Sequence, residues 1–282
     1  MPGWRANRRG KLPRKKFTTG SDAGIRATIP AVPSYDVVIP ARDEASTVGG
    51  VVRAARAAPG AGRVVVVDDG STDATAEVAA AAGAEVVQAR PPGEPGDKGR
   101  ALELGAAATS SPVLVFFDAD ILGVAPAHFE ALAAPVAAGE AALSCGMIDY
   151  GRWKNPLFLR LPPITGLRAL KREVFAAIRP ERRRGFRIEI MVNEVVARGR
   201  MPAAIRTLSG LSHRSKVEKL GWAAGLPRHL AMTAELLGCL RDVPLWTYGA
   251  YLRHLRILPE VGSGPAAGGG FIHPPAGAVD RA

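Results

Sequence analysis

The clearest fold signal in the chain is the stretch Arg63-Val-Val-Val-Val-Asp-Asp-Gly-Ser-Thr-Asp73. Its continuous apolar run, residues 63–67, is typical of a β-strand that is buried on both faces, as in a parallel sheet. Ser71 or Thr72 can serve as the N-cap of a helix that continues through Ala82. We therefore predict a strand, an acidic loop at its carboxyl end, and a returning helix.

The same unit recurs on both sides of this stretch. Upstream, Tyr35-Asp-Val-Val-Ile-Pro40 is predicted to be a strand and 44–58 the helix that follows it. Downstream, the pattern predicts strands over 84–88 and 112–117, with a helix over 99–109 between them. Four strand–helix repeats in sequence predict an α/β fold with a parallel, doubly wound sheet, whose ligand crevice lies beyond the carboxyl ends of the strands.

Size and composition fit this class. The chain has 282 residues, of which 47% are apolar and 22% charged, enough to bury a full α/β core. Cys145 and Cys239 lie far apart and form no metal-binding spacing, so we expect both in the core of a protein from a reduced compartment. The sequence has no apolar run of about 20 residues and no signal-like segment. We expect a cytoplasmic protein, with contact at the inner face of the membrane as an alternative.

The formal net charge of +11 is concentrated near the N-terminus. Seven Arg and Lys residues fall within the first sixteen positions without any acid among them, and we expect 1–34 to be a disordered basic arm. In the simpler interpretation the arm is a solvated tail. In the alternative interpretation the arm is attracted to anionic lipid. A nucleic-acid partner is not expected, because only Trp4 interleaves with these charges.

Acidic residues follow three of the predicted strands. They lie in the segments 40–44, 68–71 and 118–120, which should meet at one edge of the sheet. Glu44 or Asp73 alone would be read as a helix cap, but clustered carboxylates repel each other unless a cation or donor is present. Mg²⁺ or Mn²⁺ would resolve the conflict, since such ions keep one or two protein carboxylates while phosphates fill other positions.

Four motifs together resemble the family 2-like glycosyltransferases of the GT-A fold, over about residues 35–215. These motifs are Val37-Val-Ile-Pro-Ala-Arg-Asp-Glu44, Val66-Val-Asp-Asp-Gly-Ser-Thr-Asp73, Gly96-Asp-Lys-Gly-Arg-Ala-Leu102 and Phe116-Phe-Asp-Ala-Asp120. Within that group the chain looks like both the glucosyl-3-phosphoglycerate synthases and the polyprenyl-phosphate sugar transferases. The motifs do not separate the two. The resemblance implies a nucleotide-sugar donor, with uracil favoured as the base.

The resemblance also implies roles for single residues on the donor side. Asp120 would bind the metal ion directly together with His213, and Asp118 would face the ribose or a metal-bound water. Lys98 would approach the base or the diphosphate. The remaining residues implied in nucleotide-sugar binding are Pro40, Ala41, Arg42, Asp43, Glu44, Asp69, Gly70 and Ala119.

The second half of the domain should build the acceptor side. We predict a strand over 141–149, a loop entering a helix over 163–173, an apolar helix around Glu189 and a strand over 203–208. Glu189 would be the general base of an inverting enzyme, or would orient hydroxyl groups in a retaining one. The residues expected near a phosphorylated small-molecule or lipid acceptor are Thr165, Gly166, Arg187 and Arg214. The run 182–187 is read as a charged loop or as an anion-binding segment.

The domain boundaries follow from these assignments. The donor half spans 35–120 and the acceptor half 121–221 of one catalytic domain, 35–221. Two helices, 226–240 and 244–258, would form an appendage over 222–259 that packs on this domain, forms a homodimer or lies on a membrane. The Gly- and Pro-rich residues 260–282 are expected to be a mobile tail.

Two other functional classes were weighed. A nucleotidyltransferase would carry a Gly-rich phosphate loop directly after the first strand, and Ala41-Arg-Asp-Glu44 has no glycine. A non-catalytic nucleotide-sugar-binding protein would have lost the metal-binding carboxylates. Asp118 and Asp120 are both present here. We therefore expect an enzyme, a hexosyltransferase.

Overall fold

The structure is a computed structural model that describes residues 35–161, 163–185, 187–213 and 245–262. Several predictions lie outside these residues: the basic arm 1–34, Arg214, the helix over 226–240 and most of the tail. Within the described part, no helix is long and apolar enough to cross a membrane.

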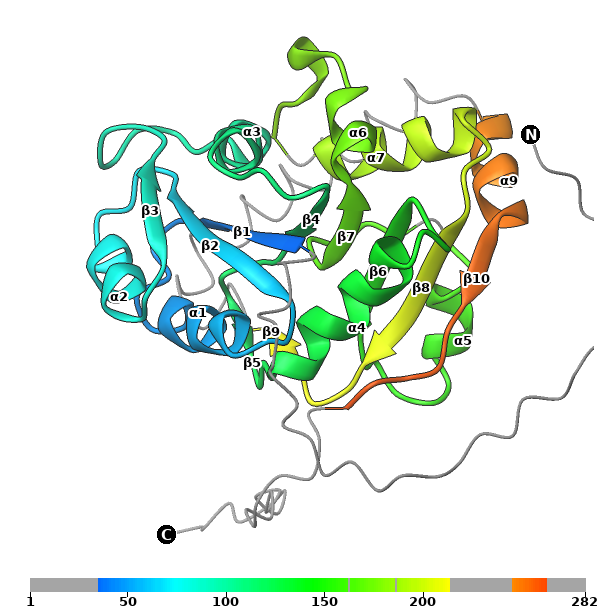
Figure 1. The fold of residues 1–282 in the computed structure, drawn as a ribbon, viewed down its shortest axis with the longest axis horizontal. Coiled ribbons are helices and arrows are strands. Elements are labelled where there is room, and N and C mark those ends of the chain that lie inside the picture. The colour runs from blue at the N-terminus through cyan, green and yellow to red at the C-terminus, as the bar shows by residue number, and fades with distance from the viewer. Residues whose placement is uncertain (1–34, 162, 186, 214–244, 263–282) are drawn as a thin grey trace, which may run out of the picture. The chain divides into compact units, whose positions relative to one another are not determined.

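One mixed eight-stranded sheet organises the chain (Figure 1), in the order β10-β8-β6-β7-β4-β1-β2-β3. The predicted parallel unit is confirmed, because β1 pairs in parallel with β2 and β4, and β2 with β3. β7 lies antiparallel between β4 and β6 and makes the sheet mixed. The strands are β1 (Tyr35–Ala41), β2 (Ala61–Asp68), β3 (Glu85–Gln88), β4 (Val113–Phe116), β6 (Leu143–Ile148), β7 (Arg168–Lys171), β8 (Ala203–Leu208) and β10 (Leu255–Ile257).

Helices cover both faces of this sheet, which creates two apolar layers. Alternation along the strands sends Val37 and Ile39 into one layer and Val38 into the other. The first layer packs on α1 (Val48–Arg56), α2 (Thr75–Ala81) and α4 (Pro126–Ala137). The second packs on α3 (Lys98–Ala107), α6 (Arg172–Ala176), α7 (Arg187–Arg198) and α9 (Leu245–Arg253). The remaining elements are α5 (Asn155–Phe158), a 3₁₀ turn (Pro180–Arg182), and a small sheet of β5 (Ile121–Leu122) and β9 (Ser212–His213).

Two predicted helix starts are wrong. The helix expected from residue 71 begins at Thr75, and the side chain of its N-cap residue, Ala74, makes no capping bond. The helix expected from residue 44 begins at Val48. The reason is that the two loops bond to each other: the Ser71 hydroxyl accepts the Asp43 N–H, and the Thr75 hydroxyl accepts the Glu44 N–H. Polar groups that could cap a helix therefore shape the edge of the site.

Two predictions in the second half are also corrected. The segment 163–173 was expected to run from a loop straight into a helix, but it contains strand β7 before α6 begins at Arg172. The helix expected over 244–258 ends at Arg253, and residues 255–257 form β10, which pairs in parallel with β8. The C-terminal part is therefore not a purely helical appendage, since it adds an edge strand to the catalytic sheet. β7 is largely buried between two strands despite its weak local propensity, whereas β10 is an edge strand held by its pairing with β8.

Asp36 joins three segments from the interior of β1. Its buried carboxylate accepts the backbone N–H groups of Arg63, Ser110 and Ser111 at 2.9, 2.9 and 2.8 Å. Burial would raise the pKa of Asp36, but these hydrogen bonds outweigh it and the pKa is lowered. At pH 7 we expect Asp36→Asn to lower the free energy of unfolding by about 2–3 kcal/mol, because an amide cannot accept all three bonds.

The pH dependence of this loss follows from the lowered pKa. The ionised carboxylate stabilises the fold above its unfolded pKa of about 4, and this contribution is lost as the pH falls through the lower folded pKa. In urea unfolding experiments from pH 7 to pH 3, the gap in free energy of unfolding between the native protein and Asp36→Asn should therefore become smaller at low pH. An unchanged gap at pH 3 would contradict this account. The exposed Glu77→Gln should change the free energy of unfolding by less than about 0.5 kcal/mol.

Candidate active site

The carboxyl ends of β1, β2 and β4 meet at one edge of the sheet, as predicted. Ala41 and Asp68 are register partners at the ends of β1 and β2, and Asp118 lies two residues after the end of β4. The loops after β1 and β2 are locked together, because the Thr72 N–H donates to the Asp43 carboxylate at 2.8 Å. Asp43 itself has a φ of 55°, in the left-handed region. The predicted donor segments, 40–44, 68–71 and 118–120, therefore lie along one edge of the site, which we call the rim.

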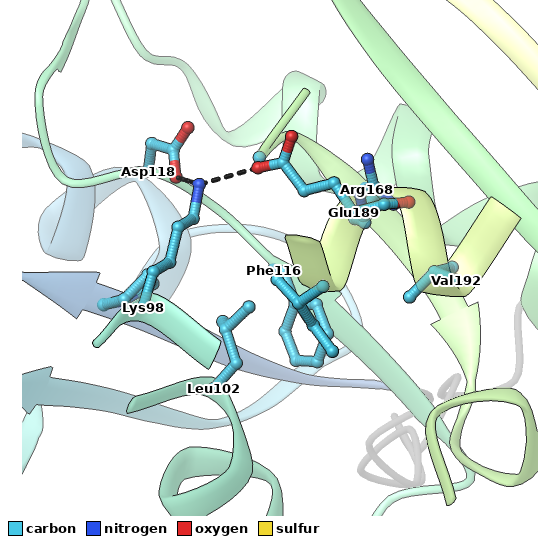
Figure 2. A pocket seen from close by; sticks show the side chains of 10 residues that line it. Lys98, Leu102, Phe116, Asp118, Arg168, Glu189 and Val192 are labelled. Carbon is cyan, nitrogen blue, oxygen red and sulfur yellow. Dashed lines mark hydrogen bonds and ion pairs between the residues drawn. The ribbon is translucent and has the colours of Figure 1, made fainter. Parts of the chain in front are cut away.

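Lys98 is the centre of the site (Figure 2). Its Nζ lies 2.8 Å from Oδ1 of Asp118 and 2.8 Å from Oε1 of Glu189. The three side chains come from the start of α3, the end of β4 and the first turn of α7. Burial disfavours both charged forms, yet Asp118 and Glu189 raise the pKa of Lys98, while Lys98 and Arg168 lower that of Glu189. Lys98 and Glu189 are therefore both ionised at neutral pH.

Arg168 fixes the acceptor-side wall. It is buried in β7, and its Nε and Nη2 donate to the Thr165 carbonyl at 2.8 and 2.6 Å, while Nη1 donates to the Glu189 carbonyl at 3.1 Å. One guanidinium thus holds both the loop before β7 and the first turn of α7. The Thr165 hydroxyl accepts the Leu167 N–H at 3.1 Å, so that this side chain shapes its own turn.

The second acid of the Asp-Ala-Asp segment lies beside the predicted histidine. Antiparallel pairing of β5 with β9 sets Ile121 opposite His213, and Nδ1 of His213 lies 3.7 Å from Oδ1 of Asp120. Interaction with Asp120 raises the pKa of His213 against the effect of partial burial. The described residues contain no group of three or more metal-binding side chains. Asp120 and His213 nevertheless fit an Mg²⁺ or Mn²⁺ ion, which needs few protein ligands when phosphates and water complete its shell.

Asp69 already has partners inside the protein. Its buried carboxylate accepts a bond from Arg90 Nε at 2.6 Å and from the Asp97 N–H at 2.6 Å. Burial raises its pKa, although both donors favour the ionised form. Arg42, predicted to line the nucleoside pocket, donates to the Asp69 carbonyl at 2.9 Å. These bonds connect the loop before α3 to the residues after β1 and β2. Base recognition by Asp69 stays a prediction.

A pocket that is partly open to solvent extends from Lys98 along the inner side of α7 (Figure 2). Its polar wall consists of the Lys98, Asp118 and Glu189 side chains, and Leu102 and Phe116 lie on its apolar side. The other lining residues are Pro40, Gly166, Arg168, Ile188 and Val192. Of the predicted site residues, the structure thus gathers Pro40, Lys98, Asp118, Gly166 and Glu189 around one cavity.

Several residues around the site were not recognised from the sequence. Asp97 is the N-cap of α3 and accepts the Gly185 N–H at 2.8 Å. Gly99 leaves room for this loop, because a Cβ there would lie 2.3 Å from the Arg183 carbonyl oxygen. Arg168 was missed because β7, the strand that buries it, was not predicted.

The arginine run is largely structural within the described residues. Arg182 pairs with Glu194 at 2.8 Å, and Arg183 pairs with Glu103 at 3.1 Å. Arg184 is more exposed and lies 3.4 Å from Asp97. These contacts support the charged-loop interpretation for the first two arginines and leave Arg184 as the member most open to an anion.

Gly166 is required by the position of Asp118. A Cβ on Gly166 would lie 2.1 Å from Oδ2 of Asp118, so Gly166→Ala must displace either the carboxylate or the loop. Because the resemblance implies a uridine donor and a metal ion, we expect this variant to weaken metal-dependent UDP binding at least about tenfold, measured by calorimetry, with the fold retained. Gly50→Ala is the matched control, since a Cβ there meets nothing within 4 Å and should slightly stabilise α1. Equal UDP affinity of both variants would contradict the steric argument.

Comparison with known proteins places this arrangement in a family. Residues 36–194 match the model of glycosyl transferase family 2. Over 133 residues the chain is 39% identical to glucosyl-3-phosphoglycerate synthase of Mycolicibacterium smegmatis, a match that covers 44% of this chain and 42% of the relative. The chain thus matches about two fifths of the length of that curated relative.

Solved structures agree over a longer span. Glucosyl-3-phosphoglycerate synthase of Mycobacterium tuberculosis in complex with phosphoglyceric acid is 28% identical, with a TM-score of 0.61 over 77% of this chain and 80% of that one. Its complex with Mn²⁺, UDP-glucose and phosphoglyceric acid is 25% identical, with a TM-score of 0.60 over 75% and 81%. The predicted GT-A fold is confirmed. The chain belongs to glycosyl transferase family 2.

Proposed function

We propose that the protein is a metal-dependent glycosyltransferase that moves a sugar from a UDP-sugar to a small phosphorylated acceptor such as 3-phosphoglycerate. The observation that carries this proposal is the placement of Asp120 and His213 beside the Asp118–Lys98–Glu189 cluster, at the carboxyl edge of the sheet. Similar proteins have been solved with UDP, Mn²⁺ or Mg²⁺ and phosphoglyceric acid. The donor, metal and acceptor classes follow from that similarity.

The chain's own residues suit this reaction. Asp120 and His213 would hold Mg²⁺ or Mn²⁺, which neutralises charge on a departing diphosphate when bound. Lys98 supplies a fixed cation at the same edge, where negative charge develops in the transition state. Asp118 and Glu189 hold the ammonium group of Lys98 in this position before a ligand binds.

Glu189 is better suited to orienting hydroxyl groups than to removing protons. Its carboxylate is buried, bonded to Lys98, and has a lowered pKa. A general base works best with a pKa near the operating pH, so a lowered pKa makes a weak base. This property supports hydrogen bonding of Glu189 to a sugar or acceptor hydroxyl, as in a retaining enzyme.

A lipid-linked phosphate is the second candidate acceptor. It is favoured by an exposed apolar and basic segment between β6 and β7, which ends at Gly166 on the pocket wall. Homodimer formation and membrane contact through the basic arm 1–34 are further proposals for regions outside the described residues.

Calorimetric titration of UDP, UDP-glucose and GDP-mannose, with Mn²⁺ and then with EDTA, tests the donor and metal. We expect metal-dependent binding of the uridine nucleotides only. Product formation from UDP-glucose is then compared for 3-phosphoglycerate, glycerol 3-phosphate and a short-chain polyprenyl phosphate. Absence of nucleotide binding with either metal would reject the proposed function, and transfer to the lipid alone would select the second acceptor.

A further inference from the structure

An unusual number of large apolar side chains is exposed in the connection between β6 and β7. Trp153 is 83% exposed and Leu157 is 62% exposed, and the short helix α5 buries none of its four residues. We call this set the α5 surface. Its members are Tyr150, Trp153, Leu157, Phe158, Leu161 and Ile164, each at least 40% exposed. Isolated exposed apolar residues are ordinary, but six within fifteen positions indicate a surface that another phase or molecule covers.

The charged side chains within residues 150–164 are all basic. Arg152, Lys154 and Arg160 are exposed, and residues 150–164 contain no Asp or Glu. The Arg152 guanidinium lies 4.9 Å from the centre of the Trp153 ring. The neighbouring Asp149 carboxylate is occupied by the Gly151 N–H and the Asn155 side chain, both at 2.7 Å. The α5 surface therefore combines apolar area with a net positive charge.

We propose that the α5 surface docks on a membrane surface that contains anionic lipids. Trp and Tyr prefer the boundary between headgroups and acyl chains, where an apolar ring and a polar edge are both satisfied. Leu157 and Phe158 can enter the acyl region, while the flanking cations contact lipid phosphates. At a dry interface with a protein partner, the three cations would be desolvated and each would need a paired negative charge. A layer of anionic headgroups supplies these charges without special complementarity.

The position of the α5 surface gives the docking a consequence. The segment continues through Ile164 directly to Gly166, which lines the pocket beside Asp118. A protein held by the α5 surface would therefore keep the acceptor-side rim of the pocket close to the bilayer. This inference goes beyond the proposed function, because membrane docking can be measured without any sugar transfer.

Tryptophan fluorescence can report on this surface alone. The four tryptophans are Trp4, Trp153, Trp222 and Trp246, so full-length protein retaining only Trp153, with the others changed to Phe, isolates the signal. The matched control retains only Trp246, which is 57% exposed on α9. Vesicles of phosphatidylcholine, with or without phosphatidylglycerol, are added to each protein, and brominated lipids serve as quenchers.

We expect Trp153 emission to shift to shorter wavelength and to be quenched by brominated lipid only with the anionic vesicles, while Trp246 changes little. In flotation, the double variant Trp153→Ser/Leu157→Ser should bind at least about tenfold more weakly. Arg152→Gln, Lys154→Gln and Arg160→Gln should each weaken binding up to about fivefold.

Three results would overturn the proposal. The first is absence of binding to anionic vesicles. The second is binding with unchanged Trp153 emission, which would assign the attraction to another basic region such as the arm. The third is protection of Trp153 from acrylamide before vesicles are added, which would show that a second copy or another part of the chain covers the α5 surface.

Discussion

Replacement of Lys98 by methionine is expected to abolish sugar transfer and to lower the free energy of unfolding by about 3 kcal/mol. The variant keeps the volume of the side chain but removes the only described cation that lies 2.8 Å from both Asp118 and Glu189. Glu189 is buried, and an unpaired buried carboxylate is far less stable than a paired one. Urea unfolding and a radiolabelled UDP-glucose transfer assay would measure the two effects.

A double variant separates the structural role of Lys98 from its chemical role. Lys98→Met/Glu189→Gln removes the cation together with one of the stranded charges, so most of the lost stability should return. Because Glu189 is itself a proposed site residue, transfer by the double variant is compared with that of Glu189→Gln alone, and it should stay well below that level since the cation at the diphosphate edge is still missing. Lys171→Met is the matched control, since its exposed pair with Glu173 at 3.8 Å should contribute less than about 1 kcal/mol. Recovered transfer in the double variant would limit Lys98 to a structural role.

Much of the donor half could be predicted because its signals are local. Strands that are buried on both faces are continuous apolar runs, and those at 35–40 and 63–67 form β1 and β2 almost as predicted. Parallel pairing then brings the residues after these strands to one edge, whatever the loops do in detail. The meeting of Pro40 and Asp118 needed no information beyond strand order.

The acceptor half was harder because its elements depend on distant partners. Arg168-Ala-Leu-Lys171 has little β-propensity, yet it forms a central strand because β4 and β6 provide hydrogen bonds on both sides. Residues 255–257 form the edge strand β10 by pairing with one distant neighbour, β8. The exposed α5 surface could not be predicted either, since Trp153 and Leu157 would read as core residues in any apolar pattern.

The acids of the site illustrate the limit of motif reasoning. Sequence patterns predicted that carboxylates would gather and need a cation, but not which cation. The structure places Lys98 between Asp118 and Glu189, and sets Asp120 apart with His213. A protein cation therefore neutralises one part of the cluster. Among the described acids at this edge, we propose that Asp120, together with His213, holds the metal ion, and this division leads to the second large effect.

Replacement of Asp120 by asparagine should reduce transfer at least about a hundredfold without loss of stability. Asp120 and His213 are 23% and 47% exposed in their side chains, so neither contributes to the core. Asp120→Asn keeps the size of the side chain but removes the charge that a hard divalent ion requires. His213→Gln should lower the affinity for Mn²⁺ with a smaller loss of transfer, because water can take the place of an imidazole.

Metal titration distinguishes this explanation from general damage to the site. In the presence of Mn²⁺, UDP should bind the native protein much more tightly than in EDTA, while Asp120→Asn should bind UDP with nearly the same weak affinity in both. His254→Gln, an exposed histidine away from the described site, is the matched control and should behave like the native protein. UDP binding by Asp120→Asn that still depends fully on the metal would show that other residues hold the ion. Loss of this metal dependence, with an unchanged urea midpoint, would assign the ion to the Asp120–His213 pair.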